Sequence, residues 1–167
     1  GSIGVVEVRK GLNKTVEMPM FGPPPGPLPR PGVRPAPFRM NLQGPEGKRN
    51  GVAGAMGIDF PYVRADVEID GVRVADVALR YKGNGTFLES RGSEKRSLKI
   101  DLNRFVDGRT LAGMTQINLH NNVTDPSSMN ETVGYALYHG AGGPAPRTGY
   151  ARVYATLPGR HTRKYLG

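Results

Sequence analysis

The sequence predicts an α+β fold, an antiparallel sheet accompanied by one principal helix. From Tyr62 onward, several short runs alternate apolar and polar side chains, as half-buried strands do. An Asp-Gly pair at 70–71 separates two of these runs and is typical of a tight hairpin. One stretch, 125–139, carries apolar residues at the three- and four-residue intervals of a helix.

The first 57 residues are predicted to be a Pro/Gly-rich, largely extended or disordered segment. Nine of the 15 prolines fall between Pro19 and Pro37, where they lock φ and remove backbone donors. Within this segment 3–8 has the alternation of a short strand and 16–20 that of a second one, although neither has a turn that would supply its neighbour. The folded domain is therefore expected over 58–167.

A hairpin centred on Asp-Gly is the first predicted element of that domain. Val67 and Ile69 precede the pair, while Val72 and Val74 follow it. Because Asp-Gly tolerates the positive φ values of a type I′ turn, we expect the two runs to pair antiparallel.

A strand with a basic face is predicted over 77–82. Arg80 and Lys82 are two residues apart in this alternating run, so they share one face. The run from Lys82 to Thr86 (KGNGT) follows, and its glycines permit tight turns that bring amide N–H groups close to a ligand.

Three more strands are predicted from alternation, over 96–102, 116–120 and 150–157, the last ending at Pro158-Gly159. The polar side chains of the first of these are expected to point outward: Ser97, Lys99 and Asp101.

The principal helix is predicted to begin at Asp125-Pro126 and to run to about His139. Asp is a preferred N-cap and Pro suits the first helical position, where no donor is needed. Gly140 or Gly142 is the expected stop. The chain ends at Gly167 without a closing helix or polar tail, which predicts a truncated piece of a larger domain.

Composition limits the classes of partner. Lys and Arg outnumber Asp and Glu by 23 to 14, which favours anionic partners. The chain has no cysteine, and its three histidines have no metal-ligand spacing, so no metal site is predicted. No apolar run approaches the roughly 20 residues that span a bilayer.

Several motifs in fixed order carry a family resemblance. ADVEIDGVRVADVALRYKGNGTF looks like paired strands ending in the signature R-x-K/R-G-N-x-S/T, and KRSLKIDLNRF looks like a Lys-rich strand. LAGMTQINLHNNVTDPSSMNETVGYALYHGAGGPAPRTGYARVY is similar to a leucine-and-asparagine strand followed by Asp-Pro-Ser, a helix and Pro-Ala-Pro-Arg. Over 62–167 the chain thus resembles the CotH kinase family, named for a spore-coat protein and related to secreted atypical kinases. It departs at Asn130, where the family commonly has Arg, and the Pro-rich insert lies outside the shared pattern.

The resemblance implies the N-terminal lobe of an atypical protein-kinase-like fold, which uses ATP and Mg²⁺. Kinases grip the triphosphate with a glycine-containing turn and a strand lysine that pairs with a helix glutamate. The residues that the resemblance assigns to nucleotide binding are Arg80, Lys82, Gly83, Asn84, Gly85, Lys99 and Glu131.

Each assignment has an alternative that needs no ligand. Lys99 can be an exposed strand lysine, and a cation at 95–96 can serve in its place. Glu131 can simply be an acid placed favourably in the early part of a helix. Arg80 and Lys82 can form a solvated edge of the sheet.

The chemical residues of a kinase are missing from the predicted set. Phosphoryl transfer needs acids that orient the acceptor and hold Mg²⁺, and in the family these lie beyond the end of this chain. No catalytic residue is therefore predicted here, and the piece itself is expected to be inactive.

Two functions follow from the resemblance. The intact protein is expected to transfer the ATP γ-phosphoryl to Ser or Thr of a secreted, cell-envelope or spore-coat protein and to be located there. The alternative is a non-catalytic coat or envelope assembly protein on the same fold.

A nucleic-acid-binding module is a third interpretation of the basic charge, prompted by cations near the chain end: Arg147, Arg152, Arg160, Arg163 and Lys164. It is disfavoured because the sequence has neither aromatic strand motifs nor a helix-turn-helix pattern.

Overall fold

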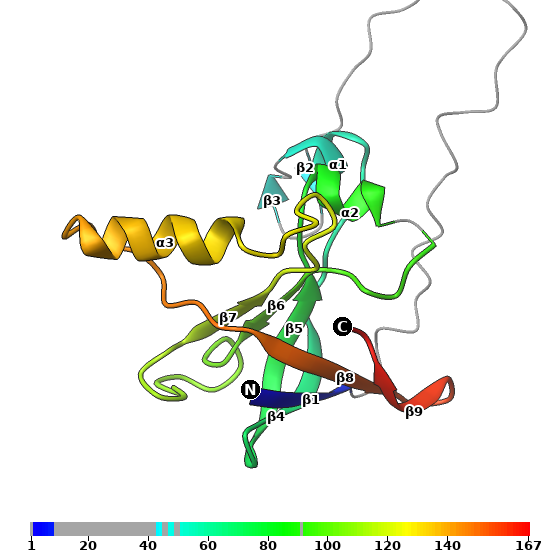
Figure 1. Ribbon diagram of the computed structural model, residues 1–167. Coiled ribbons are helices and arrows are strands. Elements are labelled where there is room, and N and C mark those ends of the chain that lie inside the picture. Colours follow the sequence, from blue (N-terminus) through cyan, green and yellow to red (C-terminus); the bar gives the residue numbers. More distant parts are fainter. Residues whose placement is uncertain (1, 9–42, 45–46, 49–50, 91) are drawn as a thin grey trace, which may run out of the picture.

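A seven-stranded sheet organises the computed structural model of the chain, which describes residues 2–8, 43–44, 47–48, 51–90 and 92–167 (Figure 1). The strand order is β7-β6-β5-β4-β1-β8-β9. Neighbouring strands run antiparallel except β1 and β8, which run parallel. The strands of this sheet are β1 (Ser2–Val8), β4 (Val63–Ile69), β5 (Val72–Tyr81), β6 (Leu98–Asp101), β7 (Gln116–Leu119), β8 (Ala151–Leu157) and β9 (His161–Tyr165).

Helices and a small second sheet complete the described structure. The helices are α1 (Gly51–Ala55), α2 (Gly85–Glu89) and α3 (Asn130–Gly140), and a separate two-stranded pair comprises β2 (Gln43–Gly44) and β3 (Gly47–Lys48). The predicted α+β class with one principal helix is confirmed. None of the helices in the described ranges has the length and apolar character needed to cross a bilayer.

The β4–β5 hairpin forms as predicted. Asp70 and Gly71 have φ values of 50° and 81°, the positive values that a type I′ turn requires at both central residues. Val67 lies opposite Val74, and Ile69 lies opposite Val72. The turn chemistry therefore accounts for the register next to the turn, from Val67 to Val74.

A bulge interrupts this hairpin beside Asp66. It allows β5 to continue as one strand through Asp76, where the alternation of apolar and polar residues breaks. Asp76 has a φ of 60°, and its backbone N–H donates to Asp66 Oδ1 at 2.9 Å. The guanidinium of Arg73 donates to the other oxygen, Asp66 Oδ2, at 2.8 Å. The buried Asp66 carboxylate thereby satisfies the backbone that the bulge leaves unpaired.

The main core lies on one side of β4, β5 and β6. Its buried residues are Ala65, Val67, Val77, Leu79, Leu98, Ile100 and Leu102. Val153 of β8 packs against them, and Figure 1 shows β8 crossing in front of β5. The sheet thus curls so that its β8 end covers the apolar face of its other end, while the opposite face stays polar.

Ser97 and Asp101 lie on that polar face, the direction that the alternation predicts, but both are buried there. The hydroxyl of Ser97 donates to Asn121 Oδ1 at 3.0 Å, and Gln116 Nε2 donates to Asp101 Oδ2 at 3.1 Å. Neighbouring polar side chains cover them, and alternation cannot show this.

The predicted strand at 3–8 is confirmed as β1, while the one predicted at 16–20 lies outside the described residues. β1 sits between β4 and β8, both far away along the chain. Its neighbours come from long-range pairing, which explains why the sequence around it contains no turn. β1 precedes residue 57 and belongs to the sheet. The predicted division of the chain at residue 57 stays a prediction.

The principal helix begins at Asn130, five residues later than predicted. Asp125 and Pro126 form a turn instead, and Ser128 has a φ of 56°, which is incompatible with a continuous helix. The predicted stop is confirmed at Gly142, which has a φ of 77°. Its N–H donates to His139 O at 2.9 Å, and the N–H of Gly143 donates to Tyr138 O at 2.8 Å, the two bonds of a Schellman motif.

Five elements, β2, β3, α1, α2 and β9, were not predicted from the sequence. Phe87 of α2 is buried and packs edge-on against Phe60, with ring centroids 4.7 Å apart. Ala53 of α1 and Ile58 join it in a second, smaller core at the end of β5. This core fixes the chain immediately after the basic face of β5.

Candidate functional site

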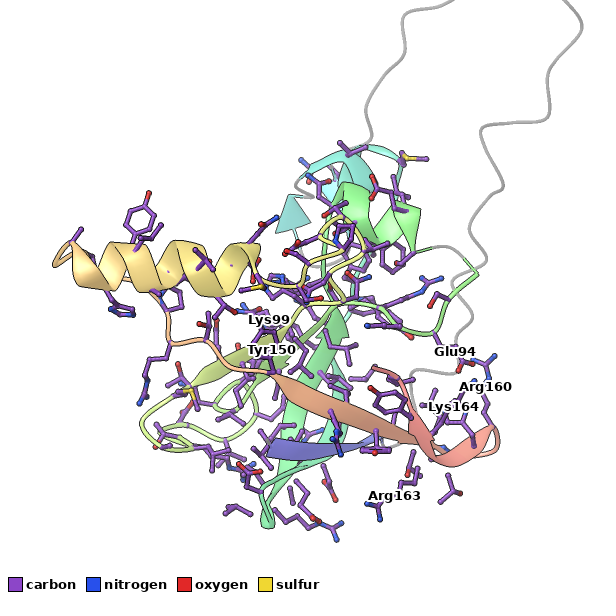
Figure 2. The ribbon with its side chains drawn as sticks, in the orientation of Figure 1. Glu94, Lys99, Tyr150, Arg160, Arg163 and Lys164 are labelled. Atoms are coloured by element: carbon purple, nitrogen blue, oxygen red, sulfur yellow. The ribbon has the colours of Figure 1, made fainter. Side chains whose placement is uncertain are left out.

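Three cationic side chains meet on the polar face of the sheet, next to the start of α3. Arg80 on β5 pairs with Lys99 on β6, and Lys82 follows two residues after Arg80 on the same face. Lys99 in turn pairs with Asn118 on β7. In Figure 2 the labelled Lys99 side chain is seen below the first turn of α3.

A histidine joins this cluster to α3. The ammonium nitrogen of Lys82 lies 2.9 Å from Nε2 of His120, and Nδ1 of His120 lies 3.2 Å from Oε1 of Glu131. The three residues come from the ends of β5 and β7 and from the first turn of α3. His120 therefore links Glu131 to Lys82 on the basic face.

The pKa values of this chain of residues reflect crowding of like charges at a half-buried position. Burial lowers the pKa of Lys82, and the charges of Lys99 and Arg80 lower it further, whereas Glu131 raises it. Burial also lowers the pKa of His120, Lys82 lowers it further, and Glu131 raises it. Both groups therefore lie within electrostatic reach of the Glu131 carboxylate.

Arg80 contributes an unused donor. Its Nε is buried and has no hydrogen-bond partner among the described residues, while Nη1 donates to Tyr81 O at 3.4 Å. The guanidinium carbon lies 5.2 Å from the ring centroid of Tyr62, which also carries Arg104 at 4.2 Å. A buried guanidinium N–H without an acceptor is costly.

The glycine turn after Lys82 has a structural role of its own. Gly83 has a φ of 111°, and a Cβ there would lie 2.7 Å from Thr86 Oγ1, so only glycine fits without displacing its neighbours. Asn84 Oδ1 accepts hydrogen bonds from the N–H groups of Val52 and Ala53 and thereby caps α1. The space around Gly85 is open, since a Cβ added there would meet no described atom within 4 Å.

A cavity of about 280 Å³ adjoins the histidine. Leu98, Leu119, Val153 and Leu166 form apolar lining, while His120, Glu131 and Tyr150 contribute polar groups. The hydroxyl of Tyr150 donates to Ser128 O at 2.9 Å, which ties β8 to the turn before α3. Arg80, Lys82 and Lys99 lie outside this lining.

The cations near the chain end form a second group on β8 and β9. Lys164 forms an ion pair with Glu94, near Arg160 at the β8–β9 turn (Figure 2). Arg163 lies over the ring of Tyr154 at 5.4 Å. Arg147, from the segment before β8, donates to Ala112 O at 3.2 Å. Several of these charges thus have contacts within the chain.

The structure brings together part of the predicted set and adds one residue to it. Arg80 lies opposite Lys99 on neighbouring strands, and His120 links Lys82 to Glu131. Their predicted role in nucleotide binding, like that of the glycine turn, stays a prediction. His120 was missed, although the alternation of the 116–120 strand places it on the face of Asn118, in line with Lys99.

The described residues offer no preformed cage for a magnesium ion, which usually takes one or two protein carboxylates together with phosphate oxygens. They contain no group of three or more His, Asp or Glu side chains arranged to hold a metal. The candidate acids have other roles, since Asp125 binds amides at the start of α3 and Asp101 binds Gln116. No step of a reaction is therefore assigned to a metal bound by these residues.

A comparison with family models matches residues 79–161, about half of the chain, to the model described as CotH kinase protein. No curated protein and no solved structure matches the chain. The matched segment begins within β5 and ends at the first residue of β9, so it contains all three cations, His120 and Glu131.

Proposed function

Because residues 79–161 match the CotH kinase model, we propose that the chain is an atypical kinase-like protein of this family and that the basic face of β5 and β6 binds the triphosphate of ATP. The intact protein would transfer the γ-phosphoryl to Ser or Thr of a secreted, envelope or coat protein. The described residues supply groups for binding, and none of them is assigned to the transfer itself.

The observation that carries the proposal is the convergence of Arg80, Lys82 and Lys99 at adjacent register positions. Like charges at this separation disfavour one another, which is one cause of the lowered pKa of Lys82. A polyanion would relieve this repulsion, because each phosphate oxygen can accept a charge-assisted hydrogen bond. Arg80 would contribute its guanidinium charge, and the lysines would act as point charges.

Glu131 has a defined part in this arrangement. Its charge raises the pKa of Lys82 and so opposes the lowering by burial and by two neighbouring cations. A protonated Lys82 is needed to bind phosphate. The acid on α3 therefore supports the charge of the basic face without contacting the ligand.

Isothermal titration of the chain with ATP and with inorganic tripolyphosphate tests this proposal. Lys99→Met and Lys82→Met each remove one charged donor, and each is expected to weaken the binding of both ligands by about tenfold or more. Arg152→Gln is the matched control, because Arg152 is an exposed cation on β8 and its loss changes the net charge equally. Equal affinity of the wild-type chain, Lys99→Met and Lys82→Met for tripolyphosphate would refute the assignment.

A further inference from the structure

The contact chain Lys82–His120–Glu131 fixes the protonation of the imidazole. An ammonium group has three donors and no acceptor, so Nε2 of His120, 2.9 Å away, must present its lone pair. A carboxylate only accepts, so Nδ1, 3.2 Å from Glu131 Oε1, must carry the hydrogen. Both contacts are satisfied together only by a neutral imidazole protonated at Nδ1.

Burial supports the same state, because it lowers the pKa of His120 and the charge of Lys82 lowers it further. A doubly protonated ring would point an N–H at the Lys82 ammonium and would lose that contact. The flipped ring orientation would present Cε1 to Lys82 and Cδ2 to Glu131, so both contacts would be lost.

We propose that His120 is a positioning residue, which links Glu131 to Lys82 and sets the direction in which the Lys82 ammonium points. Lysine has a flexible four-carbon side chain that loses much conformational freedom when it is fixed. His120 accepts a hydrogen bond from one of the three ammonium N–H groups and so holds the ammonium over the basic face. The other two N–H groups stay available for an anion. The benefit for phosphate binding rests on the proposed function, whereas the link itself does not.

The link explains how an acid on α3 acts on Lys82 at the end of β5. Glu131 is in the first turn of α3, and within the described residues its ion-pair contact is His120. Because His120 follows β7, the edge strand of the sheet, it stands between the helix and the end of β5. Movement of the first turn of α3 would therefore move the imidazole and, through it, the amine.

Nitrogen-15 NMR of the histidine side chains tests the link directly. In the wild-type chain at neutral pH, His120 is expected to show a protonated Nδ1 and an unprotonated Nε2, the less common tautomer in free histidine. Glu131→Ala removes the acceptor and Lys82→Met removes the donor, so each is expected to shift the ring toward the Nε2–H form. Detection of Nε2–H in the wild-type chain would overturn the proposal.

Tripolyphosphate affinity tests the consequence. His120→Ala is expected to weaken binding about fivefold, the worth of one ordinary hydrogen bond. The same change made on Lys82→Met is expected to have no further effect, because His120 acts through Lys82. Equal losses from His120→Ala in both backgrounds would show that it acts independently and would refute the positioning role. His139→Ala, at the exposed C-terminal end of α3, is the control and should bind as the wild type does.

The two measurements separate this inference from the function on which it partly rests. Failure of the wild-type chain to bind tripolyphosphate would refute the proposed function and with it the benefit for phosphate. The NMR tautomer would still confirm or refute the link between the three side chains.

Discussion

The carboxylate of Asp125 accepts a hydrogen bond from the backbone N–H of Asn130 at 2.9 Å, across a five-residue turn. Its other oxygen accepts from the hydroxyl of Ser127 at 2.6 Å and from the N–H of Ser127 at 3.2 Å. Met129, at the N-cap position, offers no side-chain cap. Asp125 therefore caps α3 from outside the position where an N-cap residue normally stands.

Loss of the Asp125 charge should unravel the first turn of α3. The hydrogen bond from the Ser127 hydroxyl is the main cause that lowers the Asp125 pKa, followed by the bond from the Asn130 N–H. A lowered pKa means that the stabilisation is complete above the ordinary value of about 3.9 and is lost as pH falls through the folded value. Carbon-13 Cα shifts of residues 130–133 should move toward coil values in that acid range.

Asp125→Ala should give the same shifts at neutral pH. Asp107→Ala, at an exposed acid in another turn, is the control and should leave residues 130–133 unchanged. Helical shifts that persist in Asp125→Ala would show that the cap is dispensable.

Gly83 and Gly85 should respond in opposite ways to alanine. Gly83→Ala forces a side chain into a φ of 111° and against Thr86 Oγ1, so a loss of about 1–3 kcal/mol in unfolding free energy is expected. Gly85→Ala meets open space at the start of α2 and should be neutral or slightly stabilising. Urea unfolding of the two variants measures the difference, and equal stabilities would contradict it.

The buried amide of Asn121 should be essential to the junction of β6 and β7. It accepts from the Ser97 hydroxyl at 3.0 Å and donates to Lys95 O at 3.2 Å. Asn121→Ala would leave these buried groups unsatisfied and should cost about 2 kcal/mol. Thr124→Ala, at an exposed residue in the following turn, should change the unfolding free energy little.

Neighbouring substitutions should shift the pKa of Lys82 in opposite directions. Glu131→Gln removes the charge that raises this pKa, so the value should fall further below that of a free lysine. Lys99→Met removes a charge that lowers it, so the value should rise. Carbon-13 NMR of the lysine Cε positions during a pH titration follows both, and shifts of the same sign would rule out a shared site.

The elements that the sequence predicts correctly depend on local chemistry. Asp70 and Gly71 specify the hairpin through their positive φ values, and Gly142 ends α3 because it can adopt αL. These residues act within a few positions of the structure that they determine. Their effects are therefore legible in the sequence itself.

The features that were missed depend on contacts between distant segments. The true start of α3 follows from Ser128 in αL and a carboxylate reaching to Asn130, where Asp-Pro suggested an immediate start. Ser97 is buried because Asn121 covers it from 24 residues away. Likewise, His120 becomes significant only when β7 and α3 bring Lys82 and Glu131 to its two nitrogens. A single sequence does not contain these distances.

The apolar stripe of α3 gives the helix unusual independence. Met129, Val133 and Leu137 stand at four-residue intervals, and all three are exposed, with Leu137 at 69 %. No residue of α3 is buried against the described part of the chain, and Figure 1 shows the helix extending away from the sheet. Its stability in the described structure therefore comes from the Asp125 cap and the Schellman motif at its ends more than from packing.

An isolated helix of 11 residues is marginal in water, so α3 depends on what holds its ends. Glu131 occupies the first turn, which the Asp125 carboxylate caps. The time that its carboxylate spends beside His120 is then governed by a local helix–coil equilibrium. Solvent conditions that stabilise α3, or a molecule bound to its exposed apolar stripe, would therefore determine how much of the time Glu131 supports the charge of Lys82 through His120.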